Sequence, residues 1–215
     1  MSRAEFGARL RRRPPILYAL LDAGLVAPDR YVAAGVALLE AQVDILQLRA
    51  KQVSDSCVAE WSAQLLPSAH ALGIPIILND RVELARDLGF DGVHVGQSDM
   101  APAAARTLMG ENALIGLSTH SVAQVEAADE RQLDYLGFGA IFPTETRENS
   151  SIAGCAALTR AVAASTLPLV AIGGIRPENV ETLAAAAGVA VASGLSPESD
   201  PLASVRAYRK ALASC

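Results

Sequence analysis

Eight short apolar runs recur along the chain at intervals of roughly 25 residues, and amphipathic segments lie between them. The runs are ILYALLD (16–22), DILQLRA (44–50), IPIILND (74–80), DGVHVGQ (91–97), ALIGLSTH (113–120), LDYLGFGAIF (133–142), LPLVAIGGI (167–175) and GVAVASGL (188–195). This spacing is that of a strand followed by a crossover helix, so the runs predict parallel strands. Eight such units in 215 residues predict an α/β fold, a single (β/α)8 TIM barrel over residues 16–215, with residues 1–15 as an N-terminal arm.

A doubly wound open sheet is the alternative fold for this pattern, but no G-x-G-x-x-G motif follows the first run, which disfavours dinucleotide binding. One helix is expected from Asp55 or Ser56 to about Ala71, with Pro67 bending or breaking it. Further helix starts are expected at Asp80, Ser121 and Pro177.

The composition excludes several classes of function. The net charge of -5 disfavours binding to a nucleic-acid backbone, and the run Arg11-Arg12-Arg13, followed by two prolines, is interpreted as solvated. No apolar run is long enough to span a membrane, and the N-terminus lacks the order of a signal peptide. The three cysteines show neither metal-ligand spacing nor a disulfide framework. We therefore expect a cytoplasmic protein that binds neither nucleic acid nor membrane.

Polar residues gather where the predicted strands end, which is where a barrel of this kind carries its active site. Strand alternation places Gln47, Arg49 and Lys51 on one side of the second strand. The other strand ends carry Asn79, Asp80, Gln97, Asp99, Ser118, Thr119, His120, Thr144, Thr146, Arg147, Gly173, Gly174 and Ser193.

The charged members of this set suit a polyphosphate bound with a divalent cation. Asp80 and Asp99 are carboxylates of the kind that hold Mg²⁺ together with phosphate oxygens, and Arg49, Lys51 and Arg147 neutralise the remaining charge. A second phosphate site is expected at Gly173, Gly174 and Ser193, where glycines let the backbone approach an anion. The two sites together suit a reaction between two phosphorylated substrates, one bound at each site.

Each feature has a simpler structural interpretation when taken singly. The glycines are also typical of turns, and Asp80 could cap the following helix. Arg49 and Lys51 could be solvated rim charges, and His94 could be a core histidine. The functional interpretation depends on their shared location at the strand ends.

Six motifs in order resemble the thiamine phosphate synthase family over residues 16–205: QLRAK (47–51), ILND (77–80), DGVHVGQSD (91–99), IGLSTH (115–120), DYLGFGAIFPTETR (134–147) and VAIGGIRPENV (170–180). The resemblance implies the same barrel and an enzyme that joins 4-amino-5-hydroxymethyl-2-methylpyrimidine diphosphate to 4-methyl-5-(2-phosphoethyl)thiazole. The reaction it implies is dissociative, with diphosphate leaving before the thiazole nitrogen attacks. No side-chain nucleophile is then required.

The resemblance also assigns roles to residues. The diphosphate is implied to bind Arg49, Lys51, Asn79, Ser118 and Arg147, and Mg²⁺ to bind Asp80 and Asp99. The pyrimidine is implied to lie beside Gln47 and His94. The thiazole phosphate is implied to contact Thr144, Thr146, Gly174 and Ser193. Arg147 stands where the family usually has lysine, and Ala140 where proline is usual. The segment 184–195 lacks the family's usual Gly-Ala-Asp-Gly.

Two alternatives stay open. A thiazole tautomerase on the same barrel would use His120 and need no metal, but Asp99 and the sequence PTET favour the synthase. A non-catalytic protein that binds thiazole phosphate or thiamine phosphate would have no use for paired metal carboxylates. The expected partners are small phosphorylated substrates, and a homodimer is the assembly to test.

Overall fold

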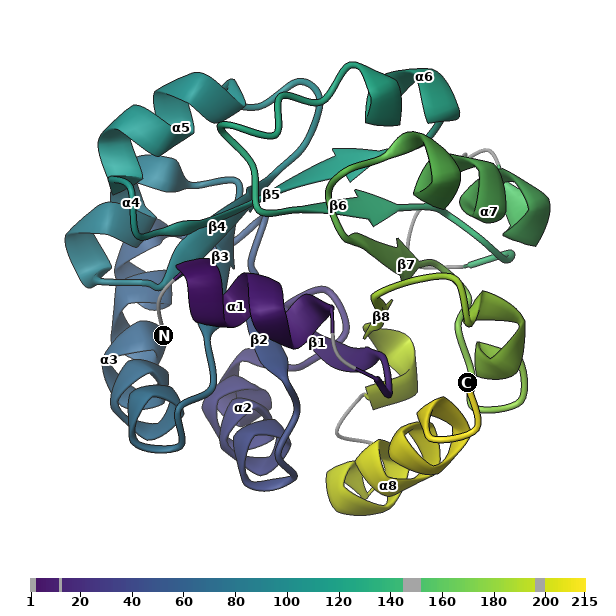
Figure 1. The fold of residues 1–215 in the computed structure, drawn as a ribbon. Coiled ribbons are helices and arrows are strands. Elements are labelled where there is room, and N and C mark those ends of the chain that lie inside the picture. The colour runs from purple at the N-terminus through teal and green to yellow at the C-terminus, as the bar shows by residue number, and fades with distance from the viewer. Residues whose placement is uncertain (1–2, 12, 145–151, 196–199) are drawn as a thin grey trace.

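The computed structural model describes residues 3–11, 13–144, 152–195 and 200–215, and the eight predicted strands close into one parallel barrel in sequence order (Figure 1). The strands are β1 (Ile16–Asp22), β2 (Ile45–Arg49), β3 (Ile76–Asn79), β4 (Gly92–Val95), β5 (Leu114–Thr119), β6 (Tyr135–Phe138), β7 (Leu169–Ile172) and β8 (Gly188–Val191). Strand β1 pairs with both β2 and β8, which closes the ring. The predicted (β/α)8 barrel is confirmed, and the open sheet is excluded.

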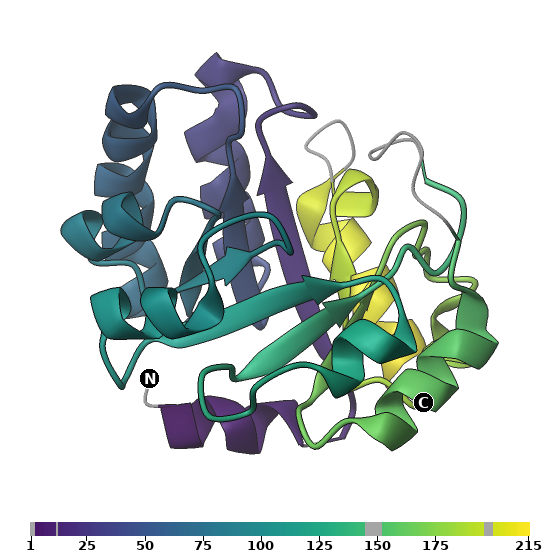
Figure 2. The ribbon, with the colours of Figure 1, turned by 90° about the horizontal axis from the view of Figure 1, so that it is seen from above.

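Helices cover the outside of the barrel (Figures 1 and 2). The α-helices are α1 (Arg3–Leu10), α2 (Tyr31–Glu40), α3 (Asp55–Ala71), α4 (Val82–Leu88), α5 (Pro102–Met109), α6 (Val122–Glu126), α7 (Gly154–Ala164) and α8 (Pro201–Leu212). Short 3-10 helices lie at η1 (Pro28–Arg30), η2 (Val180–Leu183) and η3 (Ser193–Leu195). No helix among the described residues is long and apolar enough to cross a membrane.

Helix α3 begins at Asp55 and ends at Ala71 as predicted, but its cap differs from the prediction. The N-cap of α3 is Ser54, whose hydroxyl accepts from the Cys57 amide at 3.3 Å, and not Asp55 or Ser56. The helix runs through Pro67 without a break, since buried side chains on both sides of the proline hold it against the barrel. Ser121 caps α6 as predicted, with its hydroxyl accepting from the Gln124 amide.

Two predicted helix starts are wrong. Asp80 does not begin α4, which starts at Val82, because the Asp80 backbone lies in the left-handed region at φ 65°. Pro177 does not open an α-helix either. The segment after β7 forms only the 3-10 helix η2, whose Val180 and Leu183 are buried.

The apolar core has two parts, separated by the wall of the barrel. The inner part contains residues that alternate along the strands, among them Ile16 and Tyr18 of β1. The larger, outer part lies between the strands and the surrounding helices. Strand residues are therefore apolar on both faces, which explains the continuous apolar runs in the sequence.

Helix α1 lies across the end of the barrel where the strands begin (Figures 1 and 2). Its Phe6 and Leu10 are buried in the inner core. The predicted N-terminal arm is therefore a helix packed on the barrel along most of its length. Only its final basic run matches the solvated interpretation, because Arg11 and Arg13 are exposed.

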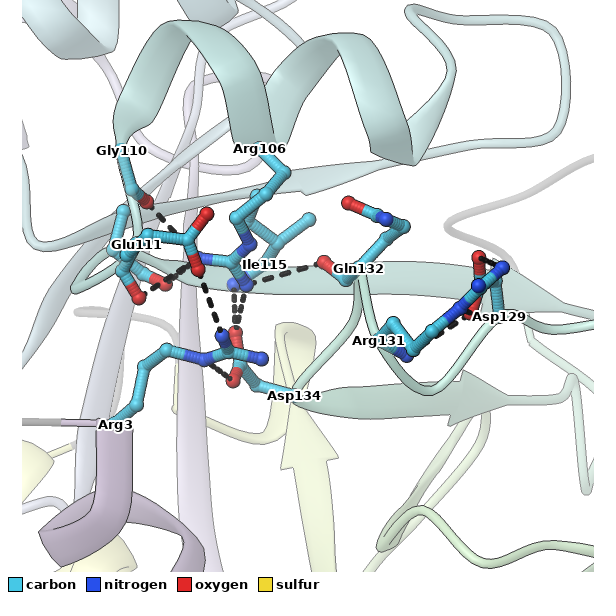
Figure 3. Close-up of polar contacts among 10 residues, drawn as sticks. Arg3, Arg106, Gly110, Glu111, Ile115, Asp129, Arg131, Gln132 and Asp134 are labelled. Atoms are coloured by element: carbon cyan, nitrogen blue, oxygen red, sulfur yellow. Dashed lines mark hydrogen bonds and ion pairs between the residues drawn. The ribbon is translucent and has the colours of Figure 1, made fainter.

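A buried ion-pair network fastens α1 to this end of the barrel (Figure 3). Asp134, just before β6, accepts from Arg3 Nε at 2.6 Å and from Arg106 Nη2 at 2.8 Å. Asp134 also accepts from the Ile115 amide at 2.7 Å, and Arg106 donates to the Ala113 carbonyl at 2.6 Å. These contacts stabilise the fold, and they lie at the end of the barrel opposite to the carboxyl ends of the strands.

Candidate active site

One cavity opens at the carboxyl ends of the strands, and its lining comes from all eight of them or the loops that follow. The described residues to which the resemblance assigns a role all line it: Gln47, Arg49, Lys51, Asn79, Asp80, His94, Asp99, Ser118, Thr144, Gly174 and Ser193. Gln97, also predicted at a strand end, is not in this lining and donates its side-chain amide to the Ser118 carbonyl at 2.6 Å. Thr146 and Arg147 lie outside the described residues. The shared location that the sequence analysis required is therefore present, while the role of each residue remains a prediction.

Asp22, the last residue of β1, pairs with Arg49 at the end of β2. Arg49 Nη1 lies 2.5 Å from Asp22 Oδ2, and Gly24 donates its amide to Asp22 Oδ1 at 2.9 Å. The Asp22 carboxylate is buried and lines the cavity. Asp22 was not predicted as a site residue, although a carboxylate that ends a buried strand was a signal for it.

Lys51 and two carboxylates gather at the ends of β2, β3 and β4. Lys51 Nζ lies 3.1 Å from Asp80 Oδ2, and Asp99 lies close enough to Asp80 to affect its pKa. Burial raises the pKa of Asp80, the Lys51 ammonium lowers it, and Asp99 raises it again. The two carboxylates thus resist being ionised together, which a cation between them would relieve.

The backbone holds both carboxylates in place. The Asp80 amide donates to the His94 carbonyl at 2.9 Å while Asp80 keeps its left-handed φ of 65°. The Gly96 amide donates to Asp99 Oδ2 at 2.7 Å. A non-glycine residue with positive φ carries conformational strain that is common at functional sites. The aspartate is therefore held at the cavity rather than used as a helix cap.

The donor set fits a divalent cation of the Mg²⁺ type. Such an ion takes one or two protein carboxylates and completes its shell with phosphate oxygens and water. Within the described residues no group of three or more His, Cys, Asp or Glu side chains could hold a metal by itself. Asp80 and Asp99 would therefore hold the ion only together with a ligand that supplies oxygens.

Arg81 braces the loop that carries Lys51. Its guanidinium donates to the Ala50 carbonyl at 2.7 Å and to the Val53 carbonyl at 2.6 Å, and it pairs with Asp55 at 2.7 Å. These contacts keep the loop closed beside Asp80. Arg81 was not predicted as a site residue, because sequence spacing does not show that it turns back toward the preceding loop.

Asn79 supplies a donor without a partner among the residues that the structure describes. Its Nδ2 is buried and makes no hydrogen bond to any described residue, although Asn79 lines the cavity. An unpaired buried amide costs roughly 1–3 kcal/mol. A ligand oxygen in the cavity would remove that cost, as the predicted diphosphate contact requires.

Five hydrogen-bonded side chains cross the inside of the barrel. Gln47 Nε2 donates to Tyr18 Oη at 2.7 Å, and Tyr18 Oη lies 2.8 Å from Tyr135 Oη. Tyr135 Oη lies 3.0 Å from His94 Nδ1, and His94 Nε2 lies 2.9 Å from Ser118 Oγ. We call these residues the polar chain.

The two tyrosines of the polar chain were not predicted as site residues. Burial raises the pKa of Tyr18 and of Tyr135 well above the ordinary value, so both phenols keep their protons at neutral pH. Alternation along β1 places Tyr18 on the same side as Asp22, and this was the signal that could have found it.

His120 follows β5 and lines the same cavity. Its Nδ1 lies 2.6 Å from the Gly139 carbonyl, and its amide donates to Gln124 Oε1 at 2.7 Å. A carbonyl oxygen only accepts, so His120 carries a proton on Nδ1. The ring is thereby oriented by the backbone of the segment after β6.

Glycines shape the end of the cavity at β7 and β8. Gly173 and Gly174 have φ of 99° and 64°. A Cβ on Gly173 would lie 2.6 Å from Ala140 Cβ, and one on Gly174 would lie 2.3 Å from the Pro143 carbonyl oxygen. This packing places the segment that ends at Thr144 against the β7 loop, and Thr144 and Ser193 both line the cavity. Only glycine fits either position, so a backbone surface suited to an anion remains open.

Comparisons with known proteins agree on one family. The family model described as thiamine monophosphate synthase matches residues 17–195. A thiamine-phosphate synthase of Chlorobium phaeobacteroides is 36% identical over 201 residues, which cover 92% of this chain and 96% of that protein. One of Xanthomonas campestris is 39% identical over 193 residues, covering 86% of this chain and 92% of that protein.

Solved structures show the same likeness. A thiamine phosphate pyrophosphorylase from Pyrococcus furiosus superposes with a TM-score of 0.83 at 28% identity, covering 93% of this chain and 96% of that one. A geranylgeranylglyceryl phosphate synthase from Thermoplasma acidophilum has a TM-score of 0.76 at 12% identity and shares the fold alone. With a family model that spans most of the barrel and relatives that match over nearly their full length, the chain belongs to the thiamine monophosphate synthase family.

Proposed function

We propose that this protein condenses 4-amino-5-hydroxymethyl-2-methylpyrimidine diphosphate with 4-methyl-5-(2-phosphoethyl)thiazole, giving thiamine phosphate and diphosphate in a Mg²⁺-dependent reaction. The observation that carries the proposal is that two chemically different ends, each with groups suited to an anion, face one cavity. Cations and paired carboxylates lie at β2–β4, and a glycine surface lies at β7–β8. The names of the relatives agree with this activity.

The diphosphate binds at the charged end. Arg49, oriented by Asp22, and Lys51 neutralise it, and Asn79 Nδ2 gains the acceptor that it lacks among the described residues. Asp80 and Asp99 hold Mg²⁺, which when bound neutralises charge on the leaving diphosphate. Ser118 donates its hydroxyl from β5. Arg147 lies outside the described residues and is the further cation that the family resemblance implies for the diphosphate.

The other substrate binds at the glycine end. The phosphate of the thiazole lies against Gly174 and Ser193, with Thr144 and Thr146 supplying hydroxyl donors. Gln47 and His94 lie beside the pyrimidine between the two anions. The substrates are then held with their reacting atoms facing each other in the middle of the cavity.

The reaction needs positioning and charge stabilisation rather than a nucleophile. The bond from the pyrimidine methylene carbon to the diphosphate oxygen breaks first, and the electron pair leaves with the diphosphate. The thiazole nitrogen then supplies the pair for the new carbon–nitrogen bond. Arg49, Lys51 and Ser118 stabilise the charge that develops on the leaving oxygen.

The tautomerase alternative rests on His120, which lines the cavity with Nδ1 held by the Gly139 carbonyl. The paired carboxylates Asp80 and Asp99 and the unpaired Asn79 amide favour a diphosphate substrate instead. The same pair disfavours a binding protein without activity. We also infer a cytoplasmic enzyme, since the cysteines are free, and keep a homodimer as the assembly to check by sedimentation.

The decisive experiment measures diphosphate release from the purified protein with both substrates, with and without Mg²⁺. Release that needs Mg²⁺, yields thiamine phosphate and disappears in Asp99→Ala establishes the proposal. Asp129→Ala is the matched control, because Asp129 pairs with Arg131 on the surface. No release under any condition contradicts the synthase, and thiazole tautomerisation with His120→Ala as control is then measured.

A further inference from the structure

The polar chain ends on one side at an amide and on the other at a hydroxyl that lines the cavity. We infer that its hydrogen bonds all run in one direction, from Gln47 to Ser118. Tyr135 is then a positioning residue that acts through His94 and leaves the Ser118 proton for the diphosphate. The last step of this inference rests on the proposed function, while the direction itself does not.

The direction follows from counting protons along the chain. The Gln47 amide nitrogen can only donate, so Tyr18 Oη accepts from it. Tyr18 has one proton left to place, and the only other hydrogen-bond partner of its hydroxyl among the described residues is Tyr135 Oη. Tyr18 therefore donates to Tyr135, because a buried phenol without an acceptor is costly.

The same count continues to Ser118. Tyr135 accepts from Tyr18 and has its own proton for His94 Nδ1. With Nδ1 accepting, neutral His94 carries its proton on Nε2 and donates it to Ser118 Oγ. Ser118 Oγ is thus an acceptor within the chain, and its own proton is available to an acceptor in the cavity.

The surroundings keep the tyrosines in place. Tyr135 is fully buried, with its ring edge-on to Phe6 of α1 at 5.8 Å and its centroid 5.4 Å from that of His94. A Cβ on Gly116 would lie 2.2 Å from Tyr135 Cζ and 2.4 Å from His94 Nδ1. Glycine at 116 therefore makes the contact between phenol and imidazole possible.

The direction matters for a dissociating diphosphate. A donor aimed at the leaving oxygen gains strength as negative charge develops there. If the hydrogen bonds ran in the opposite direction, Ser118 would donate its proton to His94 Nε2. Ser118 would then have no proton to donate to the diphosphate. The tautomer of one histidine thus decides whether Ser118 helps the leaving group.

The tautomer can be read by ¹⁵N NMR on histidine-labelled protein without substrates at pH 8. The chain has three histidines, His70, His94 and His120, and the His94→Gln variant assigns the His94 signals. We expect the Nε2–H tautomer at His94. His120 is an internal control for the Nδ1–H tautomer, since its Nδ1 faces a carbonyl oxygen and must carry a proton. An Nδ1–H tautomer or an imidazolium at His94 overturns the inference.

A double-mutant cycle then tests whether Tyr135 acts through Ser118. Tyr135→Phe keeps the ring and removes only the hydroxyl, and we expect about a tenfold loss of kcat with a smaller change in KM. In a Ser118→Ala background the same substitution should change kcat less than about twofold. Equal losses in both backgrounds overturn the role given to Tyr135.

The control for this cycle is Tyr208→Phe. Tyr208 is also buried and donates its hydroxyl to the Ile175 carbonyl at 2.9 Å, but it lies outside the polar chain. Its loss should leave kcat within about twofold. Absence of all synthase turnover in the wild type contradicts the proposed function, whereas the direction of the chain is decided by the NMR experiment alone.

Discussion

Asp22 and Arg49 are direct neighbours in the barrel: they are paired residues in the register of β1 and β2, and their side chains form an ion pair of 2.5 Å at the rim of the cavity. Asp22 is 3% exposed, so its carboxylate is held there by the fold. The guanidinium is thus oriented before any substrate arrives, and preorganised charge is what a leaving diphosphate requires.

We expect Asp22→Asn to raise KM for the pyrimidine diphosphate about tenfold, because Arg49 loses the charged partner that orients it. Steady-state kinetics with the second substrate saturating measures this. Removing a negative charge by itself would favour an anionic substrate. A lower KM would therefore show that the orientation of Arg49 affects substrate binding less than the negative charge of Asp22 does. Asp129→Asn, which disturbs only the surface pair with Arg131, should leave KM unchanged.

Asp99→Asn should raise the melting temperature of the metal-free protein at pH 7.5 while it abolishes turnover. The pKa of Asp80 is raised by burial and by Asp99, so the folded state binds this proton more tightly than the unfolded state. Ionised Asp80 therefore lowers stability at neutral pH, and this cost fades as the pH falls through its raised pKa. Melting curves in EDTA between pH 7.5 and 4 should show the melting-temperature difference between Asp99→Asn and the wild type shrinking as the pH falls. A constant difference would exclude ionised Asp80 as its cause.

Removal of the metal provides a separate test. Mg²⁺ added with inorganic diphosphate should raise the melting temperature of the wild type, because a ligand at 100 times its Kd stabilises by about 2.7 kcal/mol. Diphosphate with EDTA, and Mg²⁺ with diphosphate on Asp99→Asn, should give little shift. Equal shifts with and without Mg²⁺ would mean that Arg49, Lys51 and Asn79 hold the diphosphate without the ion.

Gly174→Ala should raise KM for the thiazole phosphate more than KM for the pyrimidine diphosphate. The new Cβ would lie 2.3 Å from the Pro143 carbonyl oxygen and displace the segment that carries Thr144. Gly73→Ala is a matched control, since Gly73 has φ of 66° and a Cβ added there would meet no atom within 4 Å. The control carries only the conformational cost of about 1 kcal/mol. Equal effects of the two substitutions on KM would argue against a thiazole phosphate site at Gly174.

Arg106→Leu should lower the free energy of unfolding by roughly 3 kcal/mol, because it leaves the buried Asp134 carboxylate with one partner fewer. The Arg106 and Asp134 side chains, paired as Figure 3 shows, are 4% and 8% exposed. Asp134 precedes β6, so the pair lies at the end of the barrel where the strands begin, opposite to the cavity. Urea denaturation measures the loss. Kinetic constants of the folded variant should stay unchanged, and an altered KM would link this network to the active site. Arg131→Leu, in an exposed pair, should leave the unfolding midpoint in place.

Local sequence was sufficient to predict the strands. All eight apolar runs contain the observed strands, because strands buried on both faces need continuous apolar residues. Helix ends were harder: Asp80 and Pro177 carry ordinary helix-start signals, yet Asp80 faces Lys51 and the segment after Pro177 packs as a 3-10 helix. Tertiary contacts outweigh the small preferences of single residues.

The sequence by itself determined the barrel, the rim on which the polar residues gather and the family, since strand spacing and motifs at strand ends are local properties of the chain. Only the tertiary structure decided that Asp22 holds Arg49, that α1 covers the start of the barrel, and that Tyr18 and Tyr135 join Gln47 to His94 and Ser118. These contacts join residues far apart in the chain. Their geometry is set by barrel closure, which no spacing along the sequence records.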